Sequence, residues 1–260
     1  MRCLKERRAA GGVKGVKHKV MTSMSKVVFL VDVDNTLLDN DKAQDDYLNH
    51  IKEHLGDYAA ERYWSIFEEL VRDLGYADYL GALQRYRLED FHDPHVLLMS
   101  SFLLDYPFPN RLYPYSLDVL KWLRSFGPTV VFSDGDVVFQ PRKIERSGIR
   151  DAVDGRVLIY IHKEEELSDV ERFYPADHYV LIDDKLRILA AIKKIWGARV
   201  TTIQPLQGHY ASDPNAQAAY QPADITVEHI GDLLNHDFSA TIDGGRRMEN
   251  STSHGHLPKR

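Results

Sequence analysis

The chain has 260 residues, 43% of them hydrophobic, and a formal net charge of −6. This composition suits a globular protein with a sizeable core and excludes a fibrous or wholly disordered chain. No stretch approaches the roughly 20 apolar residues that cross a bilayer, and the single cysteine, Cys3, has no partner for an internal disulfide. We therefore expect a cytoplasmic protein without membrane partners.

The N-terminal segment differs from the rest of the chain in its charge. Residues 1–24 carry seven Lys or Arg residues and a single Glu. We interpret residues 1–25 as a disordered basic leader; a nucleic-acid arm, a transit peptide, or sequence upstream of a start at Met21 or Met24 are the alternatives. The remaining chain is strongly acidic, which argues against nucleic acid as a partner.

The first predicted strand is a short apolar run at residues 27–31 that leads directly into Asp32 and Asp34. In open α/β sheets, ligands bind at the carboxyl ends of the strands. Two carboxylates so close together repel each other unless a cation such as Mg²⁺ lies between them or one of them transfers protons. The alternative is a simple turn, for which Asp-Asn-Thr is also suited.

Residues 41–110 are predicted to form a helical insert between the first and second strands. Apolar residues at helical spacing mark two helices that end at Gly56 and Gly75, a third covers 78–88, and Asp93-Pro94 begins a fourth. Several side chains of this insert could face a substrate or simply belong to helix faces: Tyr47, Tyr79, Arg85, Arg87 and His92.

Five further β-type runs follow the insert, at 129–132, 157–161, 179–182, 200–203 and 225–227, with helical segments between them. Near-continuous Val, Ile, Leu and Phe residues are typical of strands buried on both faces. The alternation predicts an α/β fold with a three-layer parallel sheet, formed by 26–40 and 111–237. Residues 238–260, rich in Gly, Ser, His and Arg, are predicted to be a disordered tail.

Three of these later runs also end in polar residues that could join Asp32 and Asp34. Ser133 follows the second strand, Lys163 the third, and the pair Asp183 and Asp184 the fourth. A hydroxyl and an ammonium suit an anion, and carboxylates from two strands suit Mg²⁺. Each cluster alone could be a helix cap or solvated surface. Four such clusters at successive strand ends favour one shared site.

These residues resemble the motifs of the haloacid dehalogenase-like (HAD) hydrolase superfamily. Asp-Val-Asp-Asn-Thr at 32–36 matches its D-x-D-x-T signature, and Ser133, Lys163 and the acidic pair Asp183-Asp184 match its other three motifs in order. The insert lies where that family's first type of helical cap belongs. Lys143 is an alternative to Lys163, but it falls inside a predicted helix rather than after a strand.

The resemblance implies a Rossmann-like core and an Mg²⁺-dependent phosphomonoesterase that acts on a small phosphorylated metabolite. Asp32 would form an aspartyl-phosphate and Asp34 would act as acid and base, while Ser133 and Lys163 would hold the phosphoryl oxygens. Asp32, Asp34 through its carbonyl, Asp183 and Asp184 would hold the metal. Asn35 and Thr36 would brace the loop. Family members that cleave carbon–halogen bonds lack an aspartate at the place of Asp34, which favours phosphate esters.

Other functions fit the same motifs. A phosphomutase would use the same fold, and a phosphate-binding regulatory protein would keep the acidic site without turnover. A receiver domain also groups aspartates and a lysine around Mg²⁺, but it has no room for a large helical insert. The sequence does not select the substrate or the oligomeric state.

Overall fold

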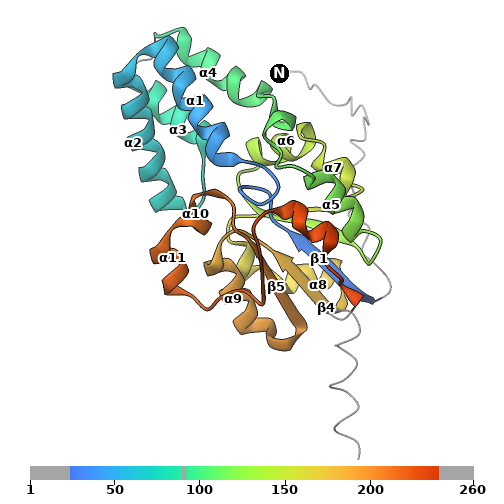
Figure 1. Ribbon diagram of the computed structural model, residues 1–260. Helices are drawn as coiled ribbons and strands as arrows, with labels where there is room; N and C mark the ends of the chain where they lie inside the picture. The colour runs from blue at the N-terminus through green and yellow to red at the C-terminus, as the bar shows by residue number, and fades with distance from the viewer. Residues whose placement is uncertain (1–23, 90–91, 240–260) are drawn as a thin grey trace, which may run out of the picture.

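The computed structural model describes residues 24–89 and 92–239. It contains a six-stranded sheet and a helical insert (Figure 1). The strands are β1 (Ser25–Val31), β2 (Thr129–Asp134), β3 (Val157–Tyr160), β4 (Ala176–Ile182), β5 (Val200–Pro205) and β6 (Ile225–Val227). The α-helices are α1 (Asn40–Leu55), α2 (Asp57–Leu74), α3 (Tyr79–Arg87), α4 (His95–Asp105), α5 (Ser116–Leu123), α6 (Phe139–Arg146), α7 (Ile149–Ala152), α8 (Leu167–Phe173), α9 (Leu186–Trp196), α10 (Gly208–Ser212) and α11 (Pro214–Ala219). Four 3₁₀ turns accompany them: η1 (Phe108–Arg111), η2 (Lys163–Glu165), η3 (Gly197–Arg199) and η4 (Ile230–Asn235).

The sheet is parallel throughout and has the order β3-β2-β1-β4-β5-β6, which confirms the predicted α/β Rossmann-like fold. Because the order reverses at β1, β2 and β3 lie on one side of it and β4, β5 and β6 on the other. The carboxyl end of β1 is therefore next to the carboxyl ends of both β2 and β4. Such a switch point is the usual ligand site of an open parallel sheet.

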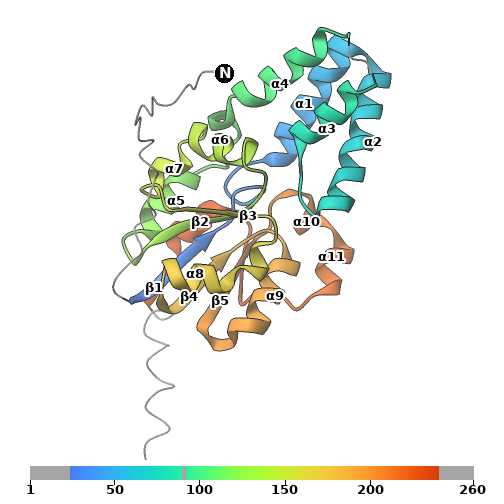
Figure 2. The same ribbon diagram turned by 180° about the vertical axis from the view of Figure 1, so that it is seen from behind.

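Alternate residues of β1 enter two separate cores, one on each face of the sheet. Val27, Phe29 and Val31 pack with α5, α6 and η4, whereas Val28 and Leu30 pack with α8 and α9. This burial on both sides explains why the strand is continuously apolar in sequence. The two helical layers are visible in Figures 1 and 2. Phe238 falls in the predicted C-terminal tail, but it is fully buried against Phe29, so the core includes it.

The predicted insert consists of α1, α2, α3 and α4, which stand beyond the carboxyl edge of the sheet (Figure 2). The caps named from sequence are present: Gly56 and Gly75 end α1 and α2 with positive φ angles of 88° and 80°. Two main-chain hydrogen bonds join the segment that leaves the core to the segment that returns to it. Asp39 N donates to Arg111 O at 2.7 Å, and Tyr113 N donates to Leu37 O at 3.0 Å.

Most of the predicted leader, residues 1–23, and most of the predicted tail, residues 240–260, lie outside the described residues. Ser25, the last residue of the predicted leader, begins β1. Within the described ranges, none of the helices combines the length and the apolar character needed to cross a membrane.

Candidate active site

Lys163 joins two acidic residues that are far apart in sequence. Asp32 follows β1, Asp183 follows β4, and Lys163 opens η2 shortly after β3. The Lys163 ammonium donates to Asp32 Oδ1 at 2.5 Å and lies 2.7 Å from Asp183 Oδ2. It also donates to the carbonyl of Phe132 at 3.1 Å. All three charged side chains are buried, so the predicted convergence at the carboxyl edge is observed.

Asp184 completes a group of three buried carboxylates. One oxygen each from Asp32, Asp183 and Asp184 lies within 4.8 Å of the others. Within the described part of the chain, neither carboxylate oxygen of Asp184 has a hydrogen-bond partner, and neither does Asp32 Oδ2. Unpartnered carboxylate oxygens in a buried site are costly. This donor set fits a hard, oxygen-binding cation such as Mg²⁺.

The electrostatics of the group reflect its burial. Burial raises the pKa of Asp32 to about 7, although the Lys163 charge acts in the opposite direction. Burial also raises the pKa of Asp184; Lys185 opposes this shift, while Asp183 and Asp32 add to it. Burial disfavours the Lys163 ammonium, but Asp183 and Asp32 outweigh it and raise the pKa of Lys163 above its usual range. A divalent cation would offset the repulsion among the carboxylates.

Asp34 is held by a second lysine. Lys143 on α6 is fully buried, and its Nζ donates to Asp34 Oδ1 at 2.6 Å and to Asn40 Oδ1 at 2.9 Å. Gln140, one turn earlier on the same helix, donates to Asp34 Oδ2 at 3.3 Å. The two lysines are thus not alternatives for one position: Lys163 contacts Asp32, and Lys143 contacts Asp34.

Sequence reasoning missed Gln140 and did not assign Lys143 to Asp34. The signal was their spacing of three residues on the helix after Ser133, which places both on one face. Gln140 Nε2 also donates to Ser133 Oγ at 2.9 Å, so the same side-chain amide bonds both Asp34 and the Ser133 hydroxyl. Gly135 makes room for it, since a Cβ there would lie 2.6 Å from Gln140 Cβ. Ser133 Oγ donates in turn to the Asp134 carbonyl at 3.2 Å.

Asn35 and Thr36 brace the loop that carries Asp34, as the sequence suggests. Asn35 has a left-handed φ of 59°, and its Oδ1 accepts hydrogen bonds from the first amides of α1, those of Asn40 and Asp41, at 3.0 and 3.2 Å. Thr36 Oγ1 accepts from the Asp184 amide at 3.0 Å. The loop is therefore fixed both to the insert and to the end of β4.

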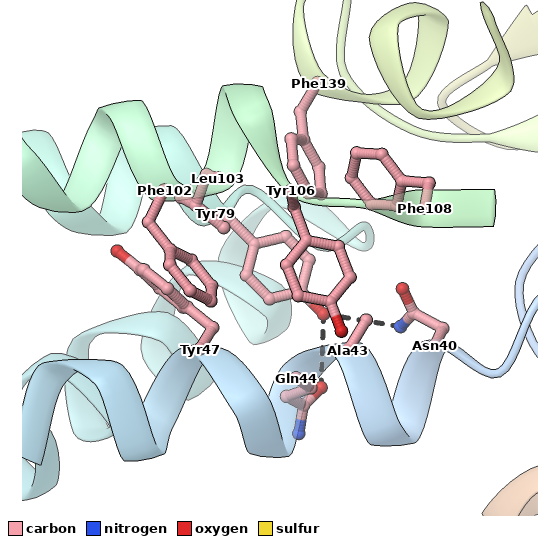
Figure 3. Close-up of a pocket in the computed structure, with 10 residues that line it drawn as sticks. All are labelled: Asn40, Ala43, Gln44, Tyr47, Tyr79, Phe102, Leu103, Tyr106, Phe108 and Phe139. Carbon is pink, nitrogen blue, oxygen red and sulfur yellow. Dashed lines mark hydrogen bonds between the residues drawn. The ribbon is translucent and has the colours of Figure 1, made fainter. Parts of the chain in front are cut away.

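A small aromatic pocket lies between the insert and the core, next to Asn40 (Figure 3). Its volume is about 10 Å³, enough for about one water molecule. Its polar groups include the Tyr79 hydroxyl, which donates to Gln44 Oε1 at 3.1 Å and accepts from Asn40 Nδ2 at 3.4 Å. The lining residues are Asn40, Ala43, Gln44, Tyr47, Tyr79, Phe102, Leu103, Tyr106, Phe108 and Phe139.

Arg85, singled out from sequence, and two residues of α10 have structural partners. Arg85 forms a long ion pair with Asp73 on the insert surface, at 3.9 Å. His209 Nδ1 lies 2.7 Å from Asp41 Oδ1, and Tyr210 lies under the Lys185 ammonium, 5.1 Å from its ring centre. These contacts connect α10 with the start of α1 and with the rim of the acidic group.

Fold and site together define an α/β protein with an acidic, lysine-bridged centre at the carboxyl edge of a parallel sheet. A protein from Burkholderia xenovorans LB400 classed as a haloacid dehalogenase-like hydrolase has 62% sequence identity and a TM-score of 0.79; the match covers 82% of this chain and 99% of that one. The chain therefore belongs to the haloacid dehalogenase-like hydrolases.

More distant structures share the fold. A protein from Bacillus subtilis classed as a HAD hydrolase, with magnesium bound, is 16% identical with a TM-score of 0.56, over 82% of this chain and all of that one. The L-2-haloacid dehalogenase of Xanthobacter autotrophicus is 17% identical with a TM-score of 0.54, over 82% and 98%. No family model and no curated protein matches the chain.

Proposed function

We propose that this hydrolase is an Mg²⁺-dependent phosphomonoesterase that acts on a small phosphorylated metabolite. The observation that carries the proposal is the arrangement of Asp32 and Asp34. Asp32 is buried against Lys163, and Asp34, two residues later, is a second carboxylate held separately by Lys143 and Gln140. Departure of a halide requires no proton, whereas an alkoxide leaving group does, and a second carboxylate serves that need.

In the proposed reaction Asp32 is the nucleophile. Lys163 engages its Oδ1, while Oδ2 has no hydrogen-bond partner among the described residues. Attack on phosphorus forms an aspartyl-phosphate and breaks the ester P–O bond, and Asp34 donates a proton to the departing oxygen. Water then attacks the aspartyl-phosphate, Asp34 takes a proton from it, and Asp32 is released together with inorganic phosphate.

Asp32, Asp183 and Asp184, with the main-chain carbonyl of Asp34, would hold the Mg²⁺ ion. When bound, the ion supplies positive charge that lets an anionic phosphate approach an anionic carboxylate. Lys163 and Ser133 would hold the phosphoryl oxygens and stabilise the charge of the transition state. The unpartnered oxygens of Asp184 support this assignment.

The helical insert would serve as the cap and select the substrate. The aromatic pocket of Figure 3 lies between the insert and the core, and Asn40, one of its lining residues, contacts Lys143 beside Asp34. A leaving group that departs from phosphorus and takes its proton from Asp34 would emerge near this wall. Closure of such a segment over a site also excludes water from the reaction.

The test is release of inorganic phosphate from an aryl phosphate and from a panel of sugar and nucleoside monophosphates, with Mg²⁺ or with EDTA. We expect Mg²⁺-dependent release that is abolished in Asp32→Asn. In parallel, halide release from L-2-chloropropionate is measured. A folded wild-type protein that releases halide but no phosphate would refute the proposal. Isomerised sugar phosphate without free phosphate would identify a mutase, and tight binding without turnover a regulatory protein.

A further inference from the structure

The outer end of α1 carries a cluster of possible metal ligands that the proposed reaction does not use. His50, Glu53 and His54 occupy the last turns of this helix, at the end farthest from the sheet (Figure 1). One ligand atom from each lies within 4.8 Å of the others. Spacings of three and four residues place side chains on one face of a helix, so the cluster follows directly from the sequence.

The two imidazole rings are already oriented. His54 Nδ1 lies 2.9 Å from the carbonyl oxygen of His50. A carbonyl only accepts hydrogen bonds, so Nδ1 carries the proton and the lone pair of His54 is on Nε2. Metal-bound histidines typically have this arrangement, with the other ring nitrogen bonded to a carbonyl or carboxylate. The His50 ring stacks on Phe102 of α4, with centroids 4.2 Å apart and planes 18° from parallel.

The local charge also favours a cation at this position. The cluster lies in the C-terminal part of α1, which ends at Gly56, and the carbonyl end of a helix carries partial negative charge. Glu53 adds a full carboxylate, and within the described ranges no Lys or Arg ion pair engages it. A metal here would therefore meet the negative charge of the helix end and of Glu53, while Lys52, the basic residue of the same turn, is paired with Asp57 at 3.4 Å.

We propose that His50, Glu53 and His54 form a transition-metal site of the Zn²⁺ type on the insert, separate from the carboxylate group at Asp32. Two imidazoles and one carboxylate favour Zn²⁺, Ni²⁺ or Cu²⁺ over Mg²⁺, which prefers oxygen ligands. Three protein ligands leave at least one coordination position for water. Bound metal would clamp the last turns of α1 to each other and would not depend on the hydrolytic reaction.

The experiment uses the full chain without an affinity tag, in excess Mg²⁺ so that the carboxylate group is saturated. Zn²⁺ is titrated against a chromophoric chelator, and Co²⁺ binding is followed by its visible absorption. We expect one saturable Zn²⁺ site whose affinity falls about tenfold or more in His50→Gln and in His54→Gln, and whose Co²⁺ bands change in Glu53→Gln. Both histidines lie on the insert away from the sheet, and circular dichroism verifies that the variants fold.

Two controls address the other histidines of the chain. His95→Gln removes an exposed imidazole elsewhere on the insert and should leave Zn²⁺ affinity unchanged. The double variant His254→Gln/His256→Gln removes the pair in the C-terminal segment and should also bind normally. The proposal is overturned if wild-type protein shows no saturable Zn²⁺ binding, if the two α1 variants keep full affinity, or if only the double variant loses it.

Discussion

Lys143 Nζ donates to Asp34 Oδ1 at 2.6 Å from a position that is almost completely buried. The same ammonium reaches Asn40, the first residue of the insert, at 2.9 Å. Lys143 therefore connects Asp34, the proposed proton donor and acceptor, with the first residue of the proposed cap. Its effect on the reaction should depend on how much the leaving group needs a proton.

Substitution Lys143→Met should slow hydrolysis selectively. For an alkyl phosphate, whose leaving oxygen needs a proton, we expect a loss of about 10²-fold in kcat/KM, typical of displaced acid–base catalysis. This constant reports the step in which the leaving group departs and not the later hydrolysis that both substrates share. For an aryl phosphate with an acidic phenol the loss should stay below about tenfold, because that leaving group departs unprotonated. Steady-state kinetics on both substrates give the ratio. Equal losses on both would show that Lys143 only supports the fold. Lys194→Met, at an exposed position of α9, serves as the surface control.

Addition of Mg²⁺ should stabilise the protein. The ion would bind the carboxylates of the folded protein and not the unfolded chain. The free energy of unfolding should therefore rise with the ratio of ion concentration to Kd, by about 2.7 kcal/mol when the concentration is one hundred times Kd. Thermal unfolding with Mg²⁺ and with EDTA measures it. An identical Tm in both conditions would contradict a metal site at Asp32, Asp183 and Asp184.

Substitution Asp184→Asn should separate stability from metal binding. It removes a buried charge whose two oxygens have no partner, so the metal-free protein should gain roughly 1–3 kcal/mol in free energy of unfolding. The further gain on adding Mg²⁺ should disappear. Asp177→Asn, at an exposed position of β4, is the matched control and should change neither quantity. Urea unfolding with and without Mg²⁺ gives both free energies. If the metal-free Asp184→Asn protein is less stable than the metal-free wild type, the Asp184 carboxylate does not destabilise the fold.

His178 should make stability depend on pH near neutrality. Burial, with the nearby Lys193 charge, lowers the pKa of His178 below the 6.5 of an unfolded chain. The unfolded state therefore binds the proton more readily, so the His178 contribution is present above pH 6.5 and is lost as the pH falls through the folded pKa. Urea unfolding between pH 5 and 8 should show a shallower pH dependence in His178→Gln than in the wild type. Parallel curves would exclude this contribution.

Alanine substitutions at Gly208 and Gly155 test how closely α10 packs against the loop that carries Asp34. Both have left-handed φ angles, 71° and 73°. A Cβ on Gly208 would lie 2.5 Å from the Asn35 side chain, whereas a Cβ on Gly155 meets nothing within 4 Å. Gly155→Ala should cost about 1 kcal/mol for backbone strain alone. Gly208→Ala should cost more by displacing Asn35, and equal free energies of unfolding for the two variants would refute that.

Much of the fold and of the site can be predicted from sequence because the strands are buried on both faces. Val27 to Val31 must be apolar at every position, so the run is visible without alignment, and parallel strands bring their carboxyl ends to one edge. Lys163 could be preferred over Lys143 because it follows a strand. Its ammonium indeed lies between Asp32 and Asp183.

What sequence could not predict depends on side-chain direction and on helix rotation. Periodicity locates α6 but not the angle at which it faces the sheet, so the contacts of Gln140 and Lys143 with Asp34 emerged only in three dimensions. The C-terminal boundary was also misplaced at Phe238, a lone aromatic in a polar segment that carries no periodic signal. The pocket beside Asn40 combines residues from α1, α3, α4 and α6, which no local pattern groups together.

The two hydrogen bonds at the neck of the insert, between Asp39 and Arg111 and between Tyr113 and Leu37, have an evolutionary consequence. They join the segment that leaves β1 to the segment that returns from the insert. The connection to the sheet therefore does not depend on which helices the insert contains. A different set of helices could replace the insert at this point, and substrate recognition could change while Asp32 and Asp34 keep their positions.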